Sequence, residues 1–544
     1  MASDTHRFFW PSFFLIAIIF FVGTLFLSLK SGGEIFVSPD ETANAFFAEH
    51  FARTGTLTVP EPLNDELDNT LHPRSVLSQN AHLVPAGFLG LPVLYGLLVF
   101  FFGKWTLLVI TPLIAILAAL AFGQILSKIF SKSVSQVSTI LFLSHPAVWY
   151  YSARGLMPNV LFTSLVIFSV FFFLSRPLHT RFKRMPVYLD FILAGIFLGL
   201  ALFVRASEVY WIVPVCFFLF LFFYKHLSWK IVSVFLLGLV VGLIPFFLFN
   251  LQTYGGLFLT GYTLHPASST GVQGVALSHS SPLSYFPNLF STLFPFGLSL
   301  RSAIKHILAY GFYLFSFLTL LSVFGLSLVI RTLSKKDYRP AYLFVLFVLS
   351  VWLGLWYGSW TIFDNPDPTQ ITMANSYVRY WLPIYVLCIP LIAELMIWMT
   401  ARIPLARLRQ NLLVIFCALI IGYNGWMVFF HGQDGLVRVT QTLTQNKQTR
   451  ADIFERTPVN SIFIVDRADK LFFPYRHVLY PLRSEKTYEL MPALSKSGPL
   501  YYYGITFPQS DIDYLNGIKL KQLGLQIEFL KTYDQESLYH IYSP

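Results

Sequence analysis

Two adjacent carboxylates, Asp40 and Glu41, follow the first long apolar run of the chain, in the segment VSPDETANAFFAEHFARTGTL. The Ser38-Pro-Asp-Glu41 spacing predicts a capping box at the start of a helix that Gly55 can end. Both carboxylates would also interact favourably with the helix N-terminus. Because the capping box occupies Glu41 but not Asp40, Asp40 could instead face a reactant as a general base.

The composition indicates that membrane-spanning segments must position these residues. The 544 residues are 55% hydrophobic and 12% charged, and repeated runs of about 20 apolar residues predict a polytopic membrane protein. The net charge of +11 fits the basic cytoplasmic loops of such a protein, so we expect no nucleic-acid partner. The three cysteines fall inside apolar runs and predict neither disulfides nor a metal site.

Twelve apolar runs are candidate spans, and the charges of the loops decide between them. The loop 30–82 holds eight acids against three Lys and Arg residues, which fits the outer face. Two runs separate it from Lys128 and Lys132, which the positive-inside rule places in the cytoplasm. One run should therefore not cross, and 83–102, which Pro and Gly interrupt, is expected to be re-entrant or in-plane. The twelve runs are 8–29, 83–102, 105–127, 135–152, 158–174, 188–204, 208–224, 231–250, 307–330, 341–360, 377–399 and 411–430.

The expected fold is an all-α polytopic membrane domain over residues 1–430, with about 11 transmembrane helices and the re-entrant or juxtamembrane segment. A small extracytoplasmic α/β domain should follow over residues 431–544, where SIFIVD, HVLYPL, LYYYGIT and LQIEFLKTY read as strands. The N-terminus is expected in the cytoplasm and the C-terminus outside. The loop 251–306 is a second extracytoplasmic loop, and its His265 and His279 lack the spacing of metal ligands.

The segments SPDETANAFFAEHFARTGTL and HLVPAGFLGLPVLYGLLVFFFG, directly after the first apolar run, carry a resemblance to a known family. They resemble the start of the C-type glycosyltransferase (GT-C) superfamily, and are most similar to the protein O-mannosyltransferases and the aminoarabinose–lipid A transferases. The resemblance implies a polyprenyl-phosphate sugar donor, a hydroxyl acceptor, and an active site facing outward. It also implies that Asp40, with Glu41 beside it, occupies the position of the catalytic carboxylate that activates the acceptor hydroxyl.

The departing lipid phosphate needs positive charge nearby rather than an acid. The resemblance implies a basic residue at Arg205, in FVRASEVYW, and an Arg-Tyr element at Arg379, in NSYVRYWLP. Arg154, in YYSARGLMPN, is a third candidate, and we rank Arg205 first. His82 and Arg74 stand where relatives are similar in having basic or histidine residues. Interfacial anchoring would explain the same arginines equally well.

One position departs from the family pattern. Asn159, in SARGLMPNVLF, stands where relatives often have a second acidic residue. An asparagine can hydrogen-bond an acceptor or a sugar, but it is neither a base nor a strong cation ligand. No metal ligand is therefore assigned, and a dependence on divalent cations is in doubt.

Two other classes remain open. A transporter or flippase of lipid-linked substrates would depend on intramembrane acids such as Glu394, and a non-catalytic membrane protein would explain Asn159. The acceptor could be a protein, a lipid or a glycan. The chain has no Asn-x-Ser/Thr sequon, which favours a multi-pass protein of a prokaryotic plasma membrane over the secretory pathway.

Overall fold

The computed structural model describes residues 2–181, 186–264, 294, 297–334, 337–362, 364 and 370–544. The chain divides into two compact units. The helical unit comprises residues 1–27, 108–248 and 266–438, and the mixed unit comprises residues 28–107, 249–265 and 439–544.

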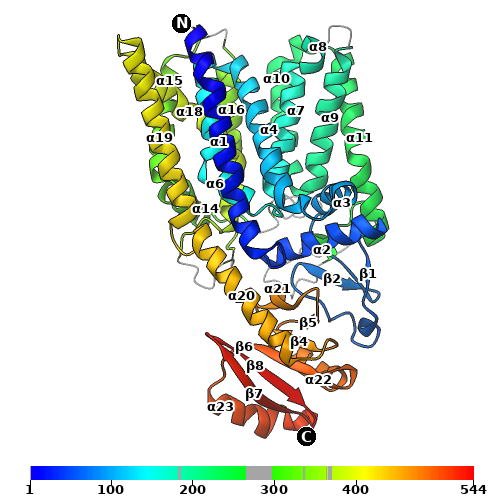
Figure 1. The fold of residues 1–544 in the computed structure, drawn as a ribbon. Helices are drawn as coiled ribbons and strands as arrows, with labels where there is room; N and C mark the ends of the chain where they lie inside the picture. The colour runs from blue at the N-terminus through cyan, green and yellow to red at the C-terminus, as the bar shows by residue number, and fades with distance from the viewer. Residues whose placement is uncertain are drawn as a thin grey trace. The chain divides into compact units, whose positions relative to one another are not determined.

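Most of the helical unit consists of long apolar helices, which Figure 1 shows in blue to yellow. Over the described residues, eight helices are long and apolar enough to cross a membrane, which makes the chain a multi-pass membrane protein. They are α1 (Ala2–Ser31), α4 (Thr106–Ile129), α7 (Pro158–Ser175), α10 (Val209–Phe223, with the 3-10 turn η2, Ala206–Glu208), α11 (Trp229–Tyr254), α16 (Arg339–Trp356), α18 (Leu382–Ala401) and α19 (Ala406–Phe430).

The other expected spans are shorter or broken. A bend of 92° separates Leu300–Tyr313 (α14, Leu300–His306, with the π-helix η5, Ile307–Tyr313) from α15 (Ser316–Arg331). The run 135–152 is divided before Pro146 into α5 (Lys132–Ser144) and α6 (Pro146–Ala153), and α9 (Tyr188–Val204) has 17 residues. The count of eleven spans therefore stays a prediction. The remaining short helices are α8 (Pro177–Arg181), η3 (Tyr224–His226) and α17 (Ser376–Tyr380).

The mixed unit contains the first predicted external loop, residues 30–82, and most of the predicted C-terminal domain. Its first part holds α2 (Pro39–Thr54), β1 (Val59–Pro60), η1 (Pro62–Asp65), β2 (Val76–Gln79), β3 (His82–Pro85), α3 (Gly90–Phe102) and, later in the chain, α12 (Gly261–Leu264). Strand β3 lies between β1 and β2 and pairs antiparallel with both. The run 83–102 thus forms a strand and a helix of 13 residues, which at 1.5 Å per residue is about 20 Å long and too short to span the hydrocarbon core.

The C-terminal part of the mixed unit is a five-stranded sheet of order β5-β4-β6-β8-β7 (Figure 1). Strand β4 is parallel to β5 and β6, whereas β8 pairs antiparallel with β6 and β7. The four predicted strands are confirmed as β4 to β7, and β8 is an additional strand. The elements are α20 (Leu436–Arg456), β4 (Ile462–Val465), α21 (Asp469–Phe472), β5 (His477–Leu479), α22 (Glu485–Ser497), β6 (Leu500–Ile505), α23 (Gln509–Tyr514), η6 (Leu515–Lys519), η7 (Lys521–Leu523), β7 (Gln526–Tyr533) and β8 (Glu536–Tyr542).

The first loop and the C-terminal sheet share one hydrophobic core. Leu67 and Leu71 of the loop are fully buried and pack with Ile464 and Tyr502 of the sheet. Compactness therefore groups the loop with the C-terminal region, whereas the expected boundary at residue 430 had grouped it with the membrane domain. The extracytoplasmic location of both parts stays a prediction, and residues 265–293 of the loop 251–306 lie outside the described residues.

In the helical unit, α9 and α11 approach each other through glycines spaced four residues apart. A Cβ built on Gly195 would lie 2.1 Å from the Phe235 carbonyl oxygen, and one on Gly238 would lie 2.2 Å from that of Ile192. Small residues at this spacing let helix backbones pack closely in a membrane, where lipid offers no hydrophobic driving force for association.

Gly238→Ala should therefore lower the thermal unfolding temperature of the detergent-purified protein, because overpacking typically costs about 1–3 kcal/mol. The matched control is Gly422→Ala in α19, where a Cβ meets nothing within 4 Å and alanine is the better helix former. Intrinsic fluorescence during heating measures both variants. Equal unfolding temperatures would contradict the close contact between α9 and α11.

Candidate functional site

The N-terminus of α2 forms the predicted capping box. The Glu41 backbone N–H donates to Ser38 Oγ at 3.3 Å, and Glu41 Oε2 accepts from the Ser38 backbone N–H at 3.1 Å. Glu41 is 2% exposed, so its carboxylate satisfies helix-terminal donors within the protein. Gly55 ends the helix in a left-handed conformation, as the sequence predicts.

Asp40 lies outside this box and is partly exposed. Its Oδ1 accepts a hydrogen bond of 2.6 Å from the Ser75 hydroxyl. Ser75 directly precedes β2 and has a φ of +62°, a region that non-glycine residues rarely adopt. The helix terminus and the serine together stabilise a negative charge at Asp40.

The other two candidates in the mixed unit lie in different surroundings. Arg74 forms an ion pair with Asp469, whose side chain is 1% exposed, and its Nε donates to Asp469 Oδ1 at 3.1 Å. His82, in β3, is exposed, and its Nδ1 lies 2.7 Å from the Asn80 carbonyl oxygen. Arg74 thus has a carboxylate partner within the protein, and its role in substrate binding stays a prediction, as does that of His82.

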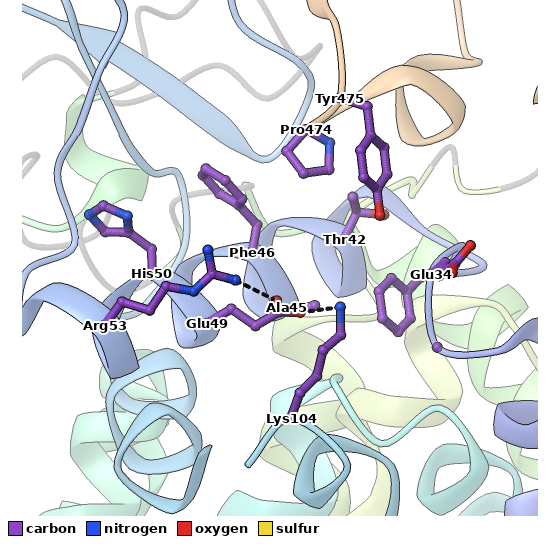
Figure 2. A pocket seen from close by; sticks show the side chains of 12 residues that line it. Glu34, Thr42, Ala45, Phe46, Glu49, His50, Arg53, Lys104, Pro474 and Tyr475 are labelled. Carbon is purple, nitrogen blue, oxygen red and sulfur yellow. Dashed lines mark hydrogen bonds and ion pairs between the residues drawn. The ribbon is translucent and has the colours of Figure 1, made fainter. Parts of the chain in front are cut away.

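A pocket of about 340 Å³ is lined by one face of α2, and Figure 2 shows the side chains around it. The carboxylate of Glu49 lies between Lys104 at 2.8 Å and Arg53 at 3.3 Å. Burial lowers the pKa of His50 below its ordinary value of 6.5, which favours the neutral form of the imidazole. The α2 residues in the lining recur every three or four positions, which leaves Asp40 on the far side of the helix. The lining comprises Gly33, Glu34, Phe36, Thr42, Ala45, Phe46, Glu49, His50, Arg53, Lys104, Pro474 and Tyr475.

In the helical unit, Arg205 ends α9 and is buried against Glu208. Arg205 Nε donates to Glu208 Oε1 at 2.8 Å, and Arg205 Nη2 donates to the Tyr357 hydroxyl at 3.0 Å. Trp211 Nε1 donates to the other oxygen of Glu208. The charge of the first-ranked arginine is therefore balanced within the protein, and a structural ion pair accounts for its burial.

Arg379 and Arg205 meet at one tyrosine. Their guanidinium carbons lie 5.1 Å and 5.0 Å from the centroid of the Tyr380 ring, within the range of a cation–π contact. Tyr380 stacks on Tyr357 with 4.3 Å between the ring centroids. Arg154 packs over the Tyr151 ring at 6.0 Å and interacts electrostatically with that tyrosine, as Arg379 does. Arg379 and Arg205 thus share the Tyr380 ring, and Arg154 is connected to Arg379 through the interaction of both with Tyr151. We call these three residues the arginine cluster.

Asn159, at the start of α7, contacts the arginine cluster. Its Nδ2 donates to the Arg379 carbonyl oxygen at 3.1 Å, and it is 3% exposed. Its Oδ1 has no hydrogen-bond partner within the described part of the chain. A carboxylate in this place would face a carbonyl oxygen without a donor, so the contact favours an amide over an acid.

Several residues of these two sites escape sequence reasoning. Ser75, Asp469 and Tyr357 each act through a partner at least 35 positions away, and no local motif marks them. Glu208 follows Arg205 by three residues, a spacing that could have indicated their ion pair.

Over the described ranges, no group of three or more His, Cys, Asp and Glu residues could hold a metal ion. His265 and His279 lie outside those ranges.

No protein-family model and no curated protein matches the chain. Solved structures do resemble it, including the following three. ArnT from Cupriavidus metallidurans bound to undecaprenyl phosphate matches with 12% identity over 97% of each chain, at a TM-score of 0.52. The Archaeoglobus fulgidus oligosaccharyltransferase in its apo form matches with 12% identity over 95% of this chain and 71% of its own, at 0.51. The oligosaccharyltransferase AglB of that organism, with an inhibitory peptide and a dolichol-phosphate, matches with 11% identity over the same shares, also at 0.51.

Both kinds of neighbour are C-type glycosyltransferases. The expected GT-C fold is therefore confirmed: the chain is a multi-pass helical membrane protein with a small C-terminal sheet, and it shares its architecture with these enzymes. At 11–12% identity the likeness establishes the fold alone.

The pairing of Arg205 with Glu208 predicts how the two residues respond to substitution. Arg205→Met or Glu208→Met alone should destabilise the protein by about 3–5 kcal/mol, because each leaves a buried charge without its partner. The double variant should be more stable than either single variant. Thermal unfolding in detergent measures all three, and a double variant whose loss equals the sum of the two single losses would contradict a structural ion pair.

Proposed function

We propose that the protein is an inverting glycosyltransferase that moves a sugar from a polyprenyl-phosphate donor to a hydroxyl acceptor at the extracytoplasmic face of the membrane. The observation that carries the proposal is the match to ArnT over 97% of both chains, because that structure contains undecaprenyl phosphate. The dolichol-phosphate in AglB supports the same class of donor. We further propose that the N-terminus is cytoplasmic and that the mixed unit lies outside.

Asp40 is the proposed general base. In a single displacement, the acceptor oxygen forms a bond to the anomeric carbon while the bond from that carbon to the phosphate oxygen breaks. The acceptor proton passes to the Asp40 carboxylate, and the lipid phosphate departs as an anion. The hydrogen bond from Ser75 orients the carboxylate. Glu41 is buried in the capping box, so we assign it to holding the helix terminus rather than to proton transfer.

The arginine cluster is the proposed site for the donor phosphate. Arg205 forms an ion pair with Glu208, and Arg379 and Arg154 are the proposed sources of positive charge. Positive charge stabilises the anion that develops on the departing phosphate. Asn159 holds the backbone of Arg379 in this arrangement.

Asp40→Asn should lower sugar transfer from a polyprenyl-phosphate donor by at least about 100-fold, because general-base catalysis typically contributes 10²- to 10⁴-fold. Purified protein in nanodiscs with radiolabelled donor provides the measurement. The control is Asp65→Asn, an exposed carboxylate of the same loop, which should retain wild-type transfer. Transfer by Asp40→Asn within threefold of wild type would refute the assignment.

Arg379→Gln and Arg154→Gln should each weaken binding of undecaprenyl phosphate by about tenfold, since a charge-assisted hydrogen bond contributes about 1.5–3 kcal/mol. Native mass spectrometry with added lipid measures the bound fraction. Arg407→Gln, an exposed residue of another loop, serves as the control. Unchanged binding in both cluster variants would place the donor phosphate elsewhere.

A further inference from the structure

The short helix α21 contacts the chain immediately before Asp40. Lys470, its second residue, donates from Nζ to the Val37 carbonyl oxygen at 2.7 Å. Val37 directly precedes the cap residue Ser38 and lies three positions before Asp40. This contact therefore holds the segment that leads into α2.

The preceding residue of α21 contacts the chain before Ser75. Asp469 Oδ2 accepts from the Arg74 backbone N–H at 2.9 Å, and its Oδ1 accepts from Arg74 Nε at 3.1 Å. The Arg74 guanidinium also donates to the Arg467 carbonyl oxygen at 2.6 Å. Because the Asp469 carboxylate is buried, water has little access to its two bonds with Arg74, whereas the bond to Arg467 is exposed. The residue next to Ser75 is therefore held through both its backbone and its side chain.

We propose that Asp469 and Lys470 are positioning residues that set the Asp40 carboxylate for proton transfer. The inference rests on the proposed function, in which Asp40 is the base. Consecutive residues of one helix hold the segments that carry Asp40 and Ser75, so a shift of α21 changes the geometry of that pair. Catalytic geometry tolerates little displacement, since misplacement by 1 Å can cost about 100-fold in rate. The C-terminal part of the mixed unit thereby acts on the proposed catalysis through α21.

A surface ion pair in the same unit provides the matched control. Lys486 Nζ contacts Asp68 Oδ2 at 2.8 Å, and their side chains are 55% and 78% exposed. This pair also joins the first loop to the C-terminal part, but it contacts neither Val37 nor Arg74. Lys486→Met should therefore leave transfer and local dynamics unchanged.

The kinetic test compares Asp469→Asn, Lys470→Met and Ser75→Ala with Lys486→Met in nanodiscs. We expect kcat to fall about tenfold in the first three variants while the donor KM stays within twofold, because they misplace the base without touching the donor site. Normal kcat in both α21 variants would overturn the inference. A raised KM with unchanged kcat would also overturn it.

Two further readouts separate positioning from general destabilisation. The acidic limb of the rate–pH profile should move to higher pH in Ser75→Ala and Asp469→Asn, since a hydrogen bond to an ionised carboxylate favours the ionised form. The kcat of the Ser75→Ala/Asp469→Asn double variant should be no more than about threefold below that of the less active single variant, because both substitutions act through Asp40. The inference would be overturned if the double variant's loss in kcat equalled the product of the two single losses while the acidic limb stayed at its wild-type pH.

Hydrogen exchange tests the positioning role of Asp469 without any measurement of activity. Peptides covering residues 34–44 and 72–79 should exchange faster in Asp469→Asn than in wild type or Lys486→Met. If the wild-type protein transfers no sugar from any polyprenyl-phosphate donor, the proposed function fails. The exchange experiment then still tests whether Asp469 and Lys470 hold the segments that carry Asp40 and Ser75. Unchanged exchange in both peptides would overturn the inference whether or not the protein is active.

Discussion

The proposed chemistry depends on the hydrogen bond from Ser75 to Asp40. This bond joins two parts of the first loop, each of which is held in place by a different set of interactions. Asp40 belongs to a helix whose start is fixed by a capping box. Ser75 directly precedes β2, which is held by antiparallel pairing with β3. Neither element alone would orient the carboxylate, but together they leave it partly exposed in a single position.

Under the proposed function the adjacent carboxylates have opposite requirements, and helix geometry satisfies both. A capping carboxylate must be buried against backbone donors, whereas a base must be reachable by the acceptor. Successive residues of a helix point about 100° apart, so Glu41 can be buried while Asp40 remains accessible. The same rotation leaves the pocket beside Glu49 on the far side of α2, away from the proposed reaction.

The sequence predicted the features that depend on local patterns. The capping box, the C-terminal strands and the apolar helices follow from spacing and composition, and the GT-C resemblance led to the right fold. Contacts across long sequence distances, such as Asp469 with Arg74 and Ser75 with Asp40, leave no periodic signal. The ranking of Arg205 as the first candidate stays a prediction, and the structure adds that Glu208, three residues later, balances its charge.

The low identity to ArnT over nearly the whole chain has a physical explanation. A membrane helix needs a sufficient number of apolar residues, but it does not need a particular apolar residue at each position. Many sequences therefore satisfy the same architecture. A residue role cannot then be transferred by position alone, and Asn159 illustrates why. Its amide donates to the Arg379 carbonyl oxygen inside a buried cluster, where a carboxylate would meet that oxygen with no proton to share. Asparagine in place of the expected acid therefore fits the local hydrogen bonding of this chain.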